Sequence, residues 1–191
     1  MNKFLLIIIL SLINCAAFYS KPVLKERINN NACIGKFSKW KEVYKGCKID
    51  YYNLENKLRI EFTGFKFYKK EKELLIGEII KSKIKIDKNS PVVLEIILEE
   101  KDPEYTYLSL HVINIFATLF SLGLIPIYTI TEHSITYRFV KGDEILGEEI
   151  RELKLNQFRG WLILPLSPFY WPSREFEKSI LQSWKNLEEE K

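Results

Sequence analysis

The chain has 191 residues, of which 47% are hydrophobic and 14% aromatic, and its formal net charge is +4. This composition excludes an intrinsically disordered chain, and the length is sufficient for one domain with a hydrophobic core. The two histidines, His111 and His133, lie far apart and in no ligand spacing with the three cysteines, so we expect no metal site and no cofactor.

The N-terminus has the features of a targeting segment. Residues 4–13 form an apolar core that is too short to span a bilayer. The core ends in Leu12-Ile13-Asn14-Cys15, which resembles the lipobox of bacterial lipoproteins. The resemblance implies that residues 1–14 are removed as a signal peptide and that lipid on the Cys15 sulfur anchors the protein to a membrane. Two alternatives remain open: ordinary secretory cleavage before Phe18, which would release a soluble protein, and an uncleaved N-terminal anchor.

We expect residues 15–56 to form a lipid-anchored tether followed by a basic arm. Residues 16–32 show little periodicity and contain three consecutive asparagines, which is typical of a connecting segment. In an exported protein Cys33 and Cys47 are predicted to form a disulfide, with two unpaired thiols as the alternative. Residues 33–88 contain fifteen Lys or Arg and eight acidic residues. This excess could bind acidic partners, although scattered lysines usually only solvate a surface.

Regular structure is predicted from residue 57 onward. Alternating apolar residues over 58–62 indicate a half-buried strand. Apolar pairs at i,i+4 spacing predict a helix over 71–83, which Gly77 weakens. Residues 92–98 are apolar on both faces, as in a central strand.

No charged residue occurs between Tyr105 and Thr131. The length of this run would suit a membrane span, but interspersed polar residues, Gly123 and Pro126, and mainly acidic flanks argue against one. We expect a buried or surface-lying helix over 108–122, then a turn and a strand. A spanning helix is the alternative.

The C-terminal part predicts a hairpin and a helix. Strands over 134–140 and 145–155 are joined by a turn at 141–144. A second uncharged apolar stretch, 160–172, precedes a helix that begins near Ser173. The apolar stripe of this helix is Phe176, Ile180, Trp184 and Leu187. Residues 57–191 therefore predict a single α+β domain, with a mixed, mostly antiparallel sheet of four or more strands and helices largely on one face.

Two apolar motifs look like those of a group of uncharacterised bacterial envelope lipoproteins. One is Gly-Leu-Ile-Pro at 123–126, before the hairpin, and the other is Trp-Leu-Ile-Leu-Pro at 161–165, after it. The resemblance covers residues 57–172 and implies an envelope location and an α/β domain. It brings no catalytic residues, and the arm at 33–56 is not part of the shared pattern.

Signs of catalysis are weak. There is no G-x-S-x-G motif, and Glu132 and His133 are adjacent on a predicted strand, so they point to opposite faces and do not form a dyad. Three nearby carboxylates are expected to form a solvated face of the hairpin: Glu148, Glu149 and Glu152. We therefore predict that the protein is not an enzyme. An unrecognised site around His133, Tyr137 and Asp143 is the weakest alternative.

The remaining signal is an aromatic and apolar surface. If 124–128 and 161–171 lie side by side, they form an apolar apron that could rest on lipid or on a partner. Its candidate residues are Leu124, Ile127, Tyr128, Trp161, Phe169, Tyr170 and Trp171. The alternative is that both segments pack as core beneath the C-terminal helix.

These features predict a lipid-anchored protein of the cell envelope, a non-enzymatic assembly or interaction module with an envelope protein as a candidate partner. The alternative is a surface adhesin or binding lipoprotein that uses the arm at 33–56. Nucleic acid is not an expected partner of an exported protein. Residues 16 and 17 after the lipobox are alanine, not the aspartate that retains many lipoproteins at the inner membrane, which favours the outer membrane by analogy.

Overall fold

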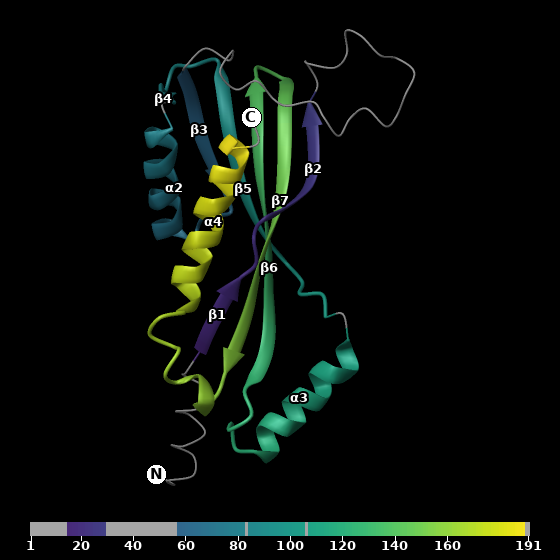
Figure 1. Cartoon of the computed structure of the whole chain (residues 1–191). Helices are drawn as coiled ribbons and strands as arrows, with labels where there is room; N and C mark the ends of the chain where they lie inside the picture. The colour runs from purple at the N-terminus through teal and green to yellow at the C-terminus, as the bar shows by residue number, and fades with distance from the viewer. Residues whose placement is uncertain (1–14, 30–56, 83, 106, 190–191) are drawn as a thin grey trace. The chain divides into compact units, whose positions relative to one another are not determined.

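A computed structural model describes residues 15–29, 57–82, 84–105 and 107–189. The predicted signal peptide, the Cys33–Cys47 bridge and the arm at 33–56 lie outside these ranges. In chain order the elements are β1 (Cys15–Tyr19), β2 (Val23–Asn29), β3 (Lys57–Thr63), α2 (Lys69–Lys81), β4 (Lys85–Ile86), β5 (Val92–Lys101), α3 (Leu108–Phe120), β6 (Ile127–Lys141), β7 (Glu144–Arg159), the 3-10 turn η2 (Trp161–Ile163) and α4 (Pro172–Glu189) (Figure 1).

Within the described ranges the strands form a mixed, mostly antiparallel sheet of seven strands, which confirms the predicted α+β class. The strand order is β1-β7-β6-β5-β3-β4, and β2 also pairs with β7. Two compact units make up the chain, and we describe each by itself. Unit 1 comprises the described parts of residues 1–21, 101–132 and 153–179, and unit 2 those of 22–100, 133–152 and 180–191.

The core of unit 2 follows the predicted periodicities. Strand β5 is buried on both faces, as expected of a central strand. Helix α2 buries its Leu75 and Ile79 side chains completely, and the α4 side chains of Ile180, Trp184 and Leu187 are also buried. The predicted strand at β3, the two helices and the hairpin are thus confirmed, with bounds shifted by a few residues.

The β6–β7 hairpin turns through two residues, Gly142 and Asp143. Gly142 has a φ of +62°, the left-handed conformation required at the first central position of a type II′ turn. A tight turn of this kind keeps the two long strands in register.

The prediction of a tether fails over residues 15–29, because this segment forms β1 and β2. Both strands pair antiparallel with β7, and Cys15 lies opposite Arg159 in the register. Ala16 and Ala17 are fully buried. Small apolar residues such as Ala16 and Ala17 carry little local strand signal, and their conformation depends on a partner strand far along the chain.

Candidate membrane or partner surface

Helix α3 directs polar side chains toward the protein and apolar side chains toward solvent. His111, Asn114 and Thr118 share one face at helical spacing and are half-buried. The Asn114 side chain fixes this face, since its Nδ2 donates to the Pro126 oxygen at 3.1 Å and its Oδ1 accepts from the Tyr128 nitrogen at 2.8 Å. All 13 residues of α3 are described, and none is buried. Amphipathic helices on globular domains normally have the opposite arrangement.

The outward face of α3 and the turn after it expose large apolar side chains. Phe120 is 86% exposed and Leu119 65%. The full set is Tyr107, Leu108, Leu110, Val112, Ile113, Phe116, Leu119, Phe120, Leu122, Leu124 and Ile125. Scattered exposed apolar residues are ordinary, but a helix with its whole apolar face in solvent indicates a surface that contacts lipid or another protein.

A second exposed apolar segment follows β7. Its exposed residues are Leu162, Leu164, Leu166, Phe169, Tyr170 and Trp171. Backbone and side-chain hydrogen bonds hold this segment against β1: the Ala17 nitrogen donates to the Tyr170 oxygen at 2.8 Å, and Ser167 Oγ donates to the Cys15 oxygen at 2.9 Å. The Phe18 ring also packs on Tyr170, with centroids 4.7 Å apart.

The two apolar segments meet where the chain leaves β7. The Trp161 nitrogen donates to the Gly123 oxygen at 3.0 Å. A Cβ on Gly160 would lie 2.9 Å from that same oxygen and 3.0 Å from the Pro126 Cα, so only glycine permits this approach. We use "apolar apron" for the exposed apolar residues of 107–125 and 162–171.

The predicted surface residues divide into two groups. Leu124, Phe169, Tyr170 and Trp171 are exposed, whereas Ile127, Tyr128 and Trp161 are half-buried. Sequence reasoning missed the exposed α3 residues Leu108, Ile113, Phe116, Leu119 and Phe120. The sequence did contain a sign of this exposure. Residues 111, 114 and 118 place the polar side chains on one face of the helix, and the opposite face is mainly apolar.

Cys15 begins β1 and contacts the apron segment through its own backbone. Cys15 is 7% exposed, and its Sγ lies 3.9 Å from Gln157 Oε1. Burial raises the pKa of the Cys15 thiol, and the opposing effect of Arg159 is smaller. No tether separates Cys15 from the folded part of unit 1.

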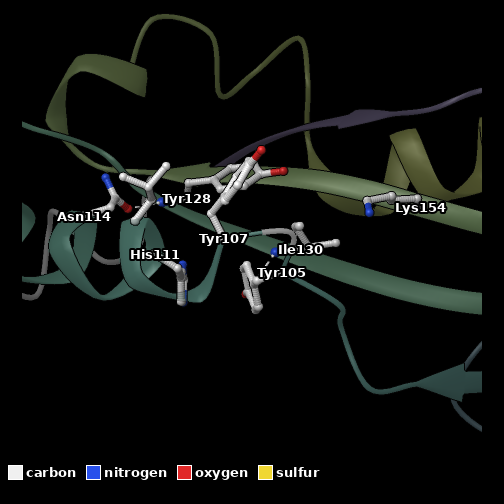
Figure 2. Close-up of a pocket in the computed structure, with 8 residues that line it drawn as sticks. Tyr105, Tyr107, His111, Asn114, Tyr128, Ile130 and Lys154 are labelled. Atoms are coloured by element: carbon white, nitrogen blue, oxygen red, sulfur yellow. Dashed lines mark hydrogen bonds between the residues drawn. The ribbon is translucent and has the colours of Figure 1, made fainter.

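A cavity of about 500 Å³ lies between α3 and the strands of unit 1 (Figure 2). Its lining residues are Tyr105, Tyr107, Leu110, His111, Asn114, Tyr128, Ile130 and Lys154. The His111 ring stacks on Tyr105 with centroids 4.0 Å apart, and the Tyr105 hydroxyl accepts from the Ile130 nitrogen at 3.3 Å. Lys154 Nζ pairs with Glu132 Oε1 at 2.8 Å, and this hydrogen bond raises the pKa of Lys154.

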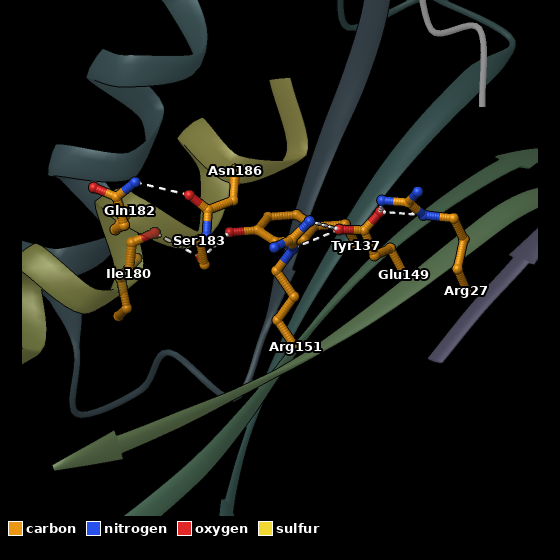
Figure 3. Close-up of polar contacts among 8 residues, drawn as sticks. All are labelled: Arg27, Tyr137, Glu149, Arg151, Ile180, Gln182, Ser183 and Asn186. Atoms are coloured by element: carbon orange, nitrogen blue, oxygen red, sulfur yellow. Dashed lines mark hydrogen bonds and ion pairs between the residues drawn. The ribbon is translucent and has the colours of Figure 1, made fainter. Parts of the chain in front are cut away.

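Unit 2 contains a buried charged cluster that the sequence did not predict (Figure 3). Glu149 was expected on a solvated face, but it is 0% exposed and pairs with both Arg27 and Arg151. Arg27 lies directly opposite Glu149 in the β2–β7 register, and Arg151 is two residues along the same face of β7. Because the inner face of β7 contains both charge signs, Glu149 can be buried there. The other two carboxylates, Glu148 and Glu152, are half-buried and pair with Arg138 and Lys25.

The residues of the hypothetical catalytic site are not brought together. His133 is 3% exposed, its Nε2 hydrogen-bonds the Tyr68 hydroxyl at 2.9 Å, and burial lowers its pKa. Tyr137 lies in the core, hydrogen-bonded to Ser183 Oγ at 2.7 Å (Figure 3). Asp143 lies in the exposed hairpin turn, about 30 Å along β6 from His133 at the usual rise per residue.

The residues that the structure describes contain no group of three or more His, Cys, Asp or Glu side chains able to hold a metal ion. Among those same residues, no helix combines the length and apolar character needed to cross a membrane. The chain matches no known protein family and no curated protein. The likeness to envelope lipoproteins and the lipid on Cys15 therefore stay predictions.

Proposed function

We propose that the protein is a lipid-anchored protein of the cell envelope that acts as a non-enzymatic interaction module, resting on the membrane through the apolar apron. The inverted polarity of α3 supports this proposal most directly. Its polar residues His111, Asn114 and Thr118 face the protein, while Phe116, Leu119 and their neighbours face outward. This is the arrangement expected where the surrounding medium is hydrocarbon.

The position of Cys15 agrees with this docking. Cys15 lies at the start of β1, and both Ser167 and Tyr170 of the apron segment bond to residues 15–17. Lipid on Cys15 would therefore hold unit 1 directly at the bilayer, with no intervening tether. Acylation requires the Cys15 side chain to turn outward after residues 1–14 are removed, because its Sγ lies against Gln157 in the full-length chain.

The chemistry of the apron suits the membrane–water boundary. It contains Tyr107, Tyr170 and Trp171, whose rings combine an apolar body with a polar group. The first charged residue on each side of α3 in sequence is acidic, Glu104 before the helix and Glu132 after it. Docking should therefore depend on apolar insertion, without need for anionic lipid.

Vesicle flotation tests the docking surface. We expect the full chain to bind phosphatidylcholine vesicles and to remain bound at high salt, since insertion of apolar side chains is not screened. Leu119→Glu should weaken the partition by about tenfold or more, because burying a leucine side chain is worth about 1.5–3 kcal/mol. Ile80→Glu on α2, at a similar exposure of 56%, is the matched control and should bind like the unsubstituted chain.

Two results would overturn the docking proposal. One is equal flotation of Leu119→Glu and the unsubstituted chain. The other is a protein that ignores vesicles but forms dimers that Leu119→Glu disrupts, which would assign the apron to a second copy. The anchor has its own test, the mass of the mature N-terminal peptide from native membranes. We expect an acylated Cys15, and a terminus at Phe18 would contradict the anchor.

A further inference from the structure

The cavity beneath α3 is a candidate for a ligand site. We propose that it binds a single-chain amphiphile with an uncharged, hydroxyl-bearing head, of the monoacylglycerol class. This inference does not require the apron to touch a membrane. It depends only on the walls and polar groups of the cavity.

The size and walls of the cavity fit a hydrocarbon chain. Its volume of about 500 Å³ falls within the range of small-molecule sites, roughly 300–1,000 Å³. Most of its wall is carbon, from the Tyr105, Tyr107 and Tyr128 rings together with Leu110 and Ile130. The cavity is open to solvent beside Tyr107 and Leu110, which are 68% and 59% exposed, so an apolar chain can enter it from that side.

Three kinds of polar group line the same space, and they set the choice of head group. The Nδ1 of His111 is buried and has no hydrogen-bond partner among the described residues. The Tyr105 hydroxyl already accepts from the Ile130 nitrogen, so its own O–H is left to donate. Tyr128 donates its hydroxyl proton to Asn156 Oδ1 at 2.7 Å, which leaves its oxygen to accept. Hydroxyl groups can both donate and accept, so they complement this set.

The local charge argues against an anionic head. Lys154 is the cationic residue of the lining, and its Nζ is already paired with Glu132. Glu104 also acts electrostatically on Lys154. A carboxylate ligand would have to compete with Glu132 for the ammonium group, whereas a neutral head would not.

The inward face of α3, together with Leu110 at the edge of the exposed face, lies over the cavity. Leu110, His111 and Asn114 line the cavity, and the Asn114 side chain ties the helix to the Pro126 and Tyr128 backbone (Figure 2). Because the helix is fastened through Asn114 and has no buried apolar residue, its N-terminal half stands over the cavity without filling it.

Photo-crosslinking in solution tests the proposal. The probe is a dodecanoyl monoglyceride with a diazirine at the chain end, added to the full chain without vesicles and below the concentration at which it aggregates. We expect crosslinks on peptides that contain Leu110 and Ile130. Leu110→Trp should fill the cavity and reduce this labelling by about tenfold, whereas Leu119→Trp, on the outward face of the same helix, should leave it unchanged. Both leucines are largely exposed, at 59% and 65%, so neither substitution should prevent folding.

A second variant tests the head group. His111→Phe retains ring stacking on Tyr105 but removes the imidazole nitrogen, and it should weaken glyceride binding by about fivefold, the loss of one hydrogen bond. It should leave binding of a plain alkane probe unchanged. Crosslinks confined to Leu108, Phe116 or Leu119, or equal labelling of the Leu110→Trp and Leu119→Trp variants, would overturn the site. Equal labelling by a dodecanoate probe would overturn the uncharged head. Vesicle flotation of Leu119→Glu and crosslinking of Leu110→Trp in solution without vesicles are separate measurements, so the docking proposal and this one can fail separately.

Discussion

Helices α2 and α3 are both 13 residues long, yet they relate to solvent in opposite ways. Helix α2 is rich in lysine and glutamate, but its Leu75 and Ile79 side chains are completely buried. Helix α3 has no charged residue, but none of its residues is buried. Apolar composition alone therefore does not bury a helix. Burial requires a stripe that matches an apolar sheet face, and α3 presents its polar stripe to the strands instead.

The two units also differ in which side chains they bury. Unit 2 buries Glu149 and Arg151 inside its core, whereas unit 1 exposes the carbon-rich apron. Apolar side chains are usually buried and charged ones exposed, so unit 2 departs from this rule by burying charge and unit 1 by exposing apolar surface. The buried ion pair stabilises the fold only while both partners are present, and the exposed apron indicates a surface that contacts lipid or another protein.

The largest effect is expected at the turn that leads from β3 to α2. Gly64 has a φ of +83°, and a Cβ there would lie 1.8 Å from the Leu98 backbone oxygen. Gly64→Ala should therefore lower the free energy of unfolding by about 4 kcal/mol or more, a loss measurable by urea denaturation. Gly142→Ala is the matched control, because its φ is also positive but its Cβ would meet nothing within 4 Å. It should cost only about 1–2 kcal/mol, the left-handed penalty alone. Equal losses would show that the close approach to Leu98 is unimportant.

Removal of the buried carboxylate should have the next largest effect. Glu149→Gln leaves the buried Arg151 guanidinium without its carboxylate, which typically costs about 3–5 kcal/mol. Glu152→Gln breaks the half-exposed pair with Lys25 and should cost under about 1 kcal/mol. Thermal unfolding of both variants gives the comparison. A small loss for Glu149→Gln would mean that water reaches this cluster.

A matched leucine pair tests the comparison of helices directly. Leu75→Ala in α2 should cost about 3 kcal/mol, because the side chain is fully buried. Leu119→Ala in α3 should change the free energy of unfolding in buffer by less than about 0.5 kcal/mol. Denaturant titrations without lipid measure both values. A large loss for Leu119→Ala would mean that the outward face of α3 is covered within the protein itself.

The smallest expected effect is an acid sensitivity of unit 2. Burial lowers the pKa of His133 below the usual range of a histidine, and the charge of Glu100 opposes this shift only in part. The neutral ring is therefore favoured in the folded protein. The resulting stability is present above the unfolded pKa and is lost as the pH falls through the lower folded pKa.

The measurement is the free energy of unfolding at about pH 7.5 and about pH 5, where we expect a lower value at the acidic pH. His133→Phe should remove this difference, whatever its effect on stability at neutral pH. If the slope persists in His133→Phe, other groups cause the acid sensitivity.

Much of unit 2 could be predicted because its signals are local. Alternation marked β3 and the hairpin, and i,i+4 spacing marked α2 and α4. The two apolar segments of the apron were also predicted, because an uncharged run can be recognised from the sequence without knowledge of what it contacts. That they meet became evident only from the contact between Gly123 and Trp161.

Long-range pairing explains the errors. β1 was assigned to a tether because its strand character comes from β7, and Cys15 and Gln157 are 142 residues apart in the chain. Glu149 was assigned to solvent because a carboxylate is normally exposed unless a specific partner neutralises it. Its partner Arg27 lies on another strand, where no local pattern could reveal it.

Local patterns in the sequence predicted β3, α2, β5, the hairpin, the stripe of α4 and two uncharged apolar runs, because each depends on residues within a few positions of one another. Only the tertiary structure decided which face of α3 meets the strands, that Cys15 begins a strand, and that a cavity remains beneath the helix. These features depend on contacts between distant segments, and the Asn114 bonds to the turn and to β6 determine the orientation of α3.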